Sequence, residues 1–309
     1  MATESGKLRV ELTTRQRPDR NPGPPWGYRL LGLGDRILPT AIADPALYAG
    51  SALAVSVMPA QRAASAEYLR IVLDRTPARS DINRHFYAFS RSLMAKLRLA
   101  RGIRPAVYYA DRRASEPFDT LCRSPEPALF GTFHIGHSDL IGCMLSDFDR
   151  KIALVRHRLG NSIDTDFMSR AFSPSVRFLW INRAEDFLFD LKNAIEQNIS
   201  VGLQCDRVEF GGRIESFQFL GKRRLFPFTI YHLATLFERP VVFAFAGPED
   251  PEGNIPVITS AVFRPADHKD PLAAARTHFQ EVLSVLEDHL REHPYLWFNF
   301  TPLNPEARP

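Results

Sequence analysis

A histidine and an aspartate five positions apart follow a strand-like run near the middle of the chain. His134 and Asp139 come directly after the apolar residues 128–133. A histidine held by a carboxylate can take a proton from an alcohol near neutral pH, and α/β proteins usually keep their chemistry at strand ends. This spacing is common in proteins, so other parts of the chain must decide whether it indicates catalysis.

The pair predicts a defined chemistry. As a general base, His134 would deprotonate an acceptor hydroxyl or amine, which would then attack a thioester carbonyl. Asp139 would reach back from a helix start to fix the imidazole tautomer. Gly136 allows a tight turn between them, and amides near it, or a basic side chain, would stabilise the oxyanion. The structural alternative is that Ser138 or Asp139 only caps a helix.

A second histidine, His137, raises the alternative of a metal-dependent hydrolase that uses His134, His137 and Asp139. The order H-x-x-H-x-D differs from the H-x-H-x-D-H of metallo-β-lactamase-type enzymes, and no H-E-x-x-H occurs. The chain also lacks G-x-S-x-G, P-loop and G-x-G-x-x-G motifs. We therefore expect no metal and no organic cofactor, and the usual hydrolase, kinase and dehydrogenase interpretations lose their main support.

The composition is that of an ordinary globular protein. The 309 residues are 45% hydrophobic and 24% charged, which predicts a core of normal size. A net charge of +4 and a pI of about 9.0 mildly favour an acidic partner such as anionic lipid, an acidic carrier protein or nucleic acid. Three cysteines without a C-x-x-C pair fit a reducing cytoplasm better than a disulfide scaffold.

The chain divides into three predicted regions. Residues 1–25 form a flexible polar tail without the layout of a signal peptide, and residues 26–104 form a helical region that faces a membrane or packs on the rest. Residues 105–309 form an α/β domain. The apolar stretch 45–58 is too short to span a bilayer, so it is predicted to be a buried or interfacial helix.

Within the helical region, the segment 82–99 combines an aromatic stripe with many arginines. Phe86, Phe89, Leu93 and Leu97 recur at helical spacing. A basic helix of this kind can lie on an anionic membrane. The simpler interpretation is that it covers a core and keeps its charged face in water.

From residue 105 onward, strand-like and helix-like segments alternate. The apolar strand runs favour a mostly parallel mixed sheet flanked by helices. Strands are expected at 128–133, 151–156, 176–182, 200–206, 214–219, 241–246 and 255–263. Helices are expected at 138–147, 162–172, 185–198, 225–238 and 271–292.

Several blocks stand in a fixed order after the first strand. Arg156 ends the second predicted strand, and Asp206 and Arg207 end the fourth. The blocks 217–224 and 295–297 follow, with the sequences Phe-Gln-Phe-Leu-Gly-Lys-Arg-Arg and Tyr-Leu-Trp. In this order the chain resembles the lysophospholipid acyltransferase superfamily over about residues 105–300. It is most similar to the bacterial lipid A lauroyl/myristoyl acyltransferase branch.

The family's H-x-x-x-x-D/E motif falls on His134 and Asp139, and its closing Y-x-W falls on residues 295–297. The chain departs from the lipid A branch at three points. It has Asp where Glu is usual, its N-terminal membrane anchor is missing or reduced, and Phe219-Leu220 replaces the commoner Phe-Phe. These differences keep the resemblance to the family but leave the acceptor open.

The resemblance implies a glycerol-3-phosphate acyltransferase-like fold and an O-acyltransferase. Such an enzyme moves a fatty acyl chain from an acyl carrier protein or acyl-CoA thioester to a hydroxyl of a lipid or glycolipid. It would be cytoplasmic, at the inner face of the cytoplasmic membrane, with an anionic membrane surface and no nucleic acid among its partners. The non-enzyme alternative is an inactive lipid- or carrier-binding protein.

The resemblance also assigns substrate-binding residues. Arg156 would bind a phosphate of the donor or acceptor, and Asp206 would orient the acceptor or pair with Arg156. A salt bridge and a turn cap are their structural alternatives. The apolar segment 226–231 would line an acyl slot, unless it only packs the core. The remaining predicted residues are Gly136, Arg207, Gly221, and a basic rim or solvated loop of Lys222, Arg223 and Arg224.

Overall fold

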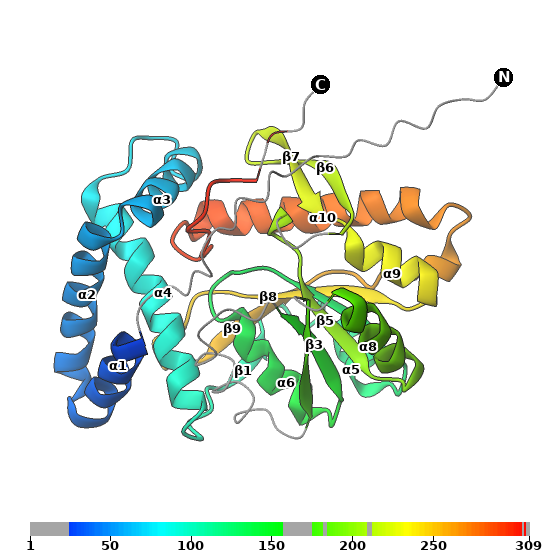
Figure 1. Ribbon diagram of the computed structural model, residues 1–309, viewed down its shortest axis with the longest axis horizontal. Coiled ribbons are helices and arrows are strands. Elements are labelled where there is room, and N and C mark those ends of the chain that lie inside the picture. The colour runs from blue at the N-terminus through cyan, green and yellow to red at the C-terminus, as the bar shows by residue number, and fades with distance from the viewer. Residues whose placement is uncertain (1–24, 157–174, 182–183, 209–211, 305, 307–309) are drawn as a thin grey trace.

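A seven-stranded mixed sheet forms the centre of the protein. The computed structural model describes residues 25–156, 175–181, 184–208, 212–304 and 306 (Figure 1). In the described chain the strand order is β1-β9-β8-β2-β5-β3-β4. The bounds are β1 Val107–Tyr109, β2 Leu129–Thr132, β3 Ile152–Arg156, β4 Val176–Trp180, β5 Ser200–Gln204, β8 Val241–Ala246 and β9 Ile255–Thr259.

Five neighbouring strands, β8, β2, β5, β3 and β4, run parallel. Strand β9 is antiparallel to β8, and β1 is parallel to β9. The predicted α/β class with a mostly parallel mixed sheet is therefore confirmed. Because the carboxyl ends of the five parallel strands meet at one edge, the residues that follow them are brought together there.

Helices cover both faces of this sheet. On one face lie α5 (Glu116–Arg123) and α6 (Ile141–Asp147), where Phe118 and Met144 pack against Phe130. On the other face lie α8 (Ala184–Glu196), α9 (Thr229–Phe237) and α10 (Pro271–Glu292), where Phe279 packs against Phe243. Since alternate strand residues point to opposite faces, this double cover explains why all of β8 is buried.

A two-stranded hairpin, β6 (Ile214–Phe219) and β7 (Lys222–Pro227), lies over α10 (Figure 1). The turn residues Leu220 and Gly221 both have positive φ, 50° and 74°, a conformation that favours glycine. The helix predicted at 225–238 is wrong in its first part, because 225–227 pair as a strand and α9 begins at Thr229. The predicted helix 162–172 lies outside the described residues.

Four helices lie beside the sheet: α1 (Pro25–Ile37), α2 (Thr40–Val57), α3 (Pro59–Val72) and α4 (Arg79–Leu99). Helix α4 packs by its aromatic stripe, since Phe86 is buried and Phe89 contacts Phe298 and Phe300. Two arginines of this region, Arg98 and Arg101, pair with Asp35 of α1. The packing interpretation of segment 82–99 therefore holds. None of the described helices is long and apolar enough to cross a membrane.

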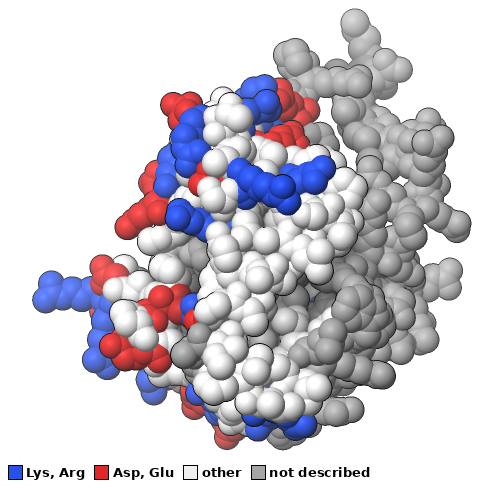
Figure 2. Space-filling view, turned by 90° about the vertical axis from the view of Figure 1, so that its left-hand side faces the viewer, with Lys and Arg blue, Asp and Glu red and all other residues white. Residues whose placement is uncertain are grey.

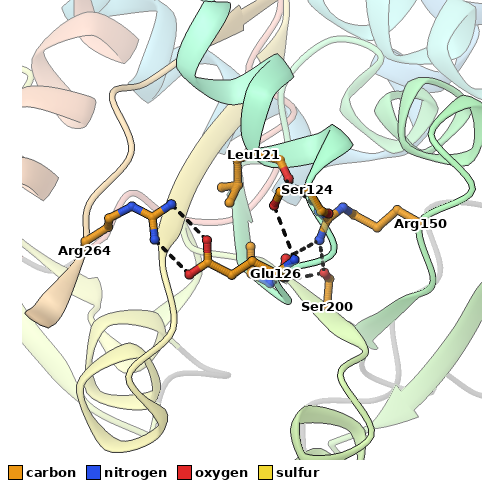
Figure 3. Close-up of polar contacts among 7 residues, drawn as sticks. Leu121, Ser124, Glu126, Arg150, Ser200 and Arg264 are labelled. Carbon is orange, nitrogen blue, oxygen red and sulfur yellow. Dashed lines mark hydrogen bonds and ion pairs between the residues drawn. The ribbon is translucent and has the colours of Figure 1, made fainter.

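A buried arginine closes the amino-terminal edge of the parallel strands (Figure 3). Arg150, just before β3, donates to the carbonyl oxygens of residues 121, 122, 124 and 126 at 2.5–3.2 Å and to Ser200 Oγ at 2.7 Å. The carboxylate of Glu126 accepts two bonds from Arg264. Because the last carbonyls of a helix have no partner within it, Arg150 supplies the missing donors at the end of α5.

Candidate active site

The pairing of β2 with β5 brings His134 and Asp206 together. The two strands run parallel with Thr132 opposite Gln204, and the ladder continues with the bond from Cys205 N to Thr132 O. His134 and Asp206 each stand two residues past these partners and therefore face one another. His134 Nδ1 lies 2.7 Å from Asp206 Oδ1, and the His134 amide donates to Oδ2 at 2.9 Å.

Asp206 is a buried carboxylate whose two oxygens are both bonded within the protein. Its Oδ2 also accepts a bond from Trp297 Nε1 at 2.9 Å. Burial raises the pKa of Asp206, but the charge and hydrogen bond of His134, the charge of Arg207 and the Trp297 bond outweigh it and hold the pKa well below 3.8. Asp206 is therefore ionised at neutral pH.

This pairing fixes the tautomer of His134. A carboxylate only accepts hydrogen bonds, so Nδ1 carries the proton and Nε2 of the neutral ring carries the lone pair. The His134 side chain is 23% exposed and that of Asp206 is 2% exposed. A partly accessible base held by a buried acid is the arrangement that general-base catalysis requires.

The segment 134–136 is bound to residues 296–298. Ile135 and Trp297 form an antiparallel bridge, Gly136 N donates to Leu296 O at 2.8 Å, and Phe298 N donates to His134 O at 2.7 Å. Gly136 has φ +49°, and a Cβ there would lie 3.1 Å from a backbone oxygen of Ala246. A glycine is therefore needed at this close approach.

The same bonds change the prediction for the oxyanion. The amide of Ile135 donates to Phe133 O and that of Gly136 to Leu296 O, while the His134 amide donates to Asp206. These three amides are already used within the protein. None of these three amides is therefore left to stabilise an oxyanion, and the other predicted donor is a basic side chain.

A buried histidine holds the Trp297 backbone. His85 Nε2 donates to Trp297 O at 2.8 Å, and Ser65 Oγ donates to His85 Nδ1 at 2.8 Å. Burial lowers the pKa of His85 to about 4, against a smaller opposite effect of the Trp297 bond. Helices α3 and α4 are thus tied through a neutral imidazole to the segment that carries Trp297.

We expect acid to loosen this attachment. Because the folded pKa of His85, about 4, lies below the unfolded value of about 6.5, the unfolded chain binds more protons between these values. Stability therefore falls as pH drops through this window, by about 2 kcal/mol from His85 between pH 7 and pH 5. Urea unfolding at both pH values should show this loss, and His85→Gln should shrink it. An unchanged pH dependence in the variant would contradict the assignment.

The second histidine of the motif has other partners. His137 Nε2 lies 3.1 Å from Glu249 Oε1, and Glu249 also pairs with Arg91 of α4. Ser92 of the same helix donates to Gly136 O at 3.0 Å. These contacts hold the loop of residues 134–137 against α4. Within the described residues no three His, Cys, Asp or Glu side chains are placed to hold a metal ion, and the side chain of Asp139 lies outside them.

A largely apolar cavity of about 70 Å³ adjoins the strand ends on the α6 face of the sheet. Its apolar walls include Phe130, Ile141 and Leu145. Its polar residues come from the edge that carries His134, and they are Thr132, Ser138, Arg156 and Gln204. Such a space suits a hydrocarbon chain whose polar end stays at the strand ends.

The predicted site residues fall into two groups. His134, Gly136, Asp206 and Arg207 lie together, and Arg156, which stacks over the Phe178 ring at 5.6 Å, lines the adjoining cavity. The described bonds of Asp206 go to His134 and Trp297, and not to Arg156 as one expectation had it. For Asp139 the backbone lies in the short 3-10 helix η1 (Ser138–Leu140), and its predicted role falls outside the described side chains.

The second group lies on the hairpin and contacts other residues. Gly221 forms the turn, Lys222 pairs with Glu306 at 2.7 Å, and Arg223 donates to Ser216. Arg224 is buried and donates to Asn304 O. The expected basic rim is therefore a strand, with only its first two side chains at the surface. The hairpin meets the site through Phe219, whose ring packs edge-on against Trp297.

Sequence reasoning missed two members of the site, the partner role of Asp206 and the indole N–H of Trp297. Both residues stand in blocks that the sequence singles out, but their contact with His134 depends on which strands are neighbours. The site is therefore defined by its own geometry, since no family model and no curated protein matches the chain.

Proposed function

We propose that the protein is an O-acyltransferase with a lysophospholipid acyltransferase-like fold. It transfers a fatty acyl chain from an acyl carrier protein or acyl-CoA thioester to a hydroxyl of a lipid or glycolipid. The observation that carries this proposal is the bond between His134 Nδ1 and the buried Asp206, at the carboxyl edge of parallel strands. The apolar cavity beside this pair supports a hydrocarbon substrate over a small polar one.

In the proposed reaction His134 acts as general base. Its Nε2 takes the proton from the acceptor hydroxyl while the oxygen attacks the thioester carbonyl. The tetrahedral oxyanion then collapses, the carbon–sulfur bond breaks, and the imidazolium returns its proton to the leaving thiolate. Asp206 stabilises the imidazolium between these two steps. The products are an ester and a thiol, so no covalent enzyme intermediate is needed.

Two arginines supply the positive charge that this reaction needs. Arg207 acts beside the pair, where its charge already lowers the pKa of Asp206, and it stabilises the oxyanion. Arg156 lines the cavity and binds a phosphate of the donor arm or acceptor. At about 70 Å³ the cavity has room for several water-sized groups, so it takes part of an acyl chain.

The test is lipid mass spectrometry of cells with the gene intact, deleted, or carrying His134→Ala. We expect one lipid to lose a single acyl chain in both mutants, which also identifies the acceptor and the chain length. The transfer rate of the purified variant should be at least about 100-fold lower than that of the parent protein, because the variant lacks the base. His232→Ala, a partly exposed histidine with partners elsewhere, is the matched control. An unchanged lipidome with folded protein present would contradict the proposal.

A further inference from the structure

Exposed apolar side chains gather on α1, α2 and the turn between them. Seven of the twelve large hydrophobic residues that are exposed in the described chain lie between residues 33 and 57. They are Leu33, Ile37, Leu38, Ile42, Tyr48, Leu53 and Val57, which are 38–66% exposed. Clustered exposed apolar residues of this kind mark a surface that contacts another molecule or a membrane.

Helix α2 has two opposite faces that are both largely uncharged. Leu47, Ser51 and Val55 recur every four residues and are buried against the protein. On the opposite side, Ile42, Ala46, Ala49, Leu53 and Val57 recur at intervals of three or four residues, and all five are exposed. A helix that only covers a core normally presents polar and charged residues to water on its outer face. The outer stripe of α2 presents apolar residues to water instead.

The charges of this region lie at the ends of the stripe. No charged residue occurs between Asp44 and Arg62. At the carboxyl end of α2, Arg79 donates to Ser56 Oγ at 2.8 Å and Arg62 donates to Val55 O at 3.4 Å. Among the described residues neither arginine forms an ion pair. Figure 2 shows this side of the molecule, with a broad uncharged area below a group of basic and acidic side chains.

We propose that this α1–α2 face lies on the surface of an anionic bilayer. Helix α2 would lie parallel to the membrane plane, with its outer stripe in the acyl–headgroup boundary and Arg62 and Arg79 among the lipid phosphates. A stripe without hydrogen-bonding side chains fits such a boundary better than a protein partner, since the two arginines beside it form no ion pair with the described residues and can bind phosphates. This face replaces α4, whose aromatic stripe is buried, as the membrane contact.

The test is co-sedimentation of the full-length protein with vesicles. We expect strong binding to vesicles of equal parts phosphatidylglycerol and phosphatidylcholine, and weak binding to phosphatidylcholine alone or at 1 M salt. The double variant Ile42→Glu/Leu53→Glu should bind at least about tenfold less, because two charges enter the apolar boundary. The matched control is Phe189→Glu/Leu236→Glu, at exposed positions of α8 and α9, which should bind like the parent.

A fluorescent probe keeps the proposal testable if the glutamate variants fold poorly. An environment-sensitive dye on Leu53→Cys should shift to the blue when anionic vesicles are added, and the same dye on Leu236→Cys should not. Equal binding to neutral vesicles, full binding by the double variant, or no shift at residue 53 would overturn the proposal. So would a dimer in light scattering that only the double variant separates, because the face would then join two copies.

This inference is independent of the proposed activity. The vesicle assays can be run on the His134→Ala protein, which should bind like the parent. Loss of acyl transfer with intact vesicle binding, and the reverse, are therefore separate results.

Discussion

Replacing Asp206 with asparagine is expected to lower the turnover number by about 10³- to 10⁴-fold while the fold is kept. Oδ2 accepts two N–H donors, from the His134 backbone and from Trp297. The asparagine must therefore place its carbonyl oxygen there and turn its NH₂ group toward His134 Nδ1. That nitrogen then has to accept a bond, so the proton moves to Nε2 and the ring cannot act as a base.

The matched variant is Asp139→Asn, which separates the two candidate carboxylates. If Asp206 orients His134, Asp206→Asn should abolish the limb of the pH–rate profile that reports the imidazole, and Asp139→Asn should keep it. Trp297→Phe removes only the N–H bond to Oδ2 and should lower the rate by a smaller factor. Retained activity in Asp206→Asn together with its loss in Asp139→Asn would assign the orienting role to Asp139, as the local spacing predicts. Circular dichroism and urea unfolding control for loss of structure.

Replacing Arg150 with methionine is expected to lower the free energy of unfolding by about 3 kcal/mol or more. Arg150 is 8% exposed and serves four carbonyl oxygens and one hydroxyl. Methionine fills similar volume but leaves the carbonyl oxygens of residues 122, 124 and 126 without a described donor, and each unsatisfied buried group costs about 1–3 kcal/mol. Leu121 O and Ser200 Oγ keep bonds from Ser124 and from the Ala128 amide. Urea denaturation at pH 7 measures the change.

Arg123→Met is the matched control for this prediction. Arg123 is at the surface, with a side chain that is 66% exposed and an i, i+4 pair with Asp119, so its loss should cost less than about 1 kcal/mol. Arg150 lies at the edge of the sheet opposite His134, and the turnover of the folded Arg150→Met protein should therefore stay close to that of the parent. Equal destabilisation by the two variants would show that the hydrogen bonds of Arg150 drawn in Figure 3 contribute little to stability.

Much of the fold could be predicted from local pattern. The apolar strands are confirmed, and the helix predicted at 271–292 has the predicted bounds at both ends. Its start is fixed by Asp270, whose side chain accepts a bond from Ala273 N. Short elements could not be predicted, since β1 has three residues and α5 has eight. Strand β7 was mistaken for the start of a helix, because an apolar run such as 225–227 carries no period that separates the two.

The histidine of the candidate site was predictable from the sequence, but its partners were not. His134 stands at a strand end, which the residues before it already indicate. The sequence predicts Asp139 as its carboxylate partner because Asp139 is near in the chain. The bond to Asp206 instead results from β5 lying next to β2. Trp297 joins the site through backbone pairing with Ile135, which no spacing in the sequence records.

The position of β5 also determines when the strands can pair during synthesis of the chain. This strand lies between β2 and β3 although it follows both in the chain. During synthesis β2 and β3 therefore exist before their shared neighbour, with backbone groups that no native strand can yet cover on that side. Non-local pairing of this kind slows folding and exposes unpaired strands. Strand β8, the other neighbour of β2, follows β5 in the chain as well. Both edges of β2 therefore stay unpaired until the second half of the chain has been made, and an unpaired strand edge can pair with another chain.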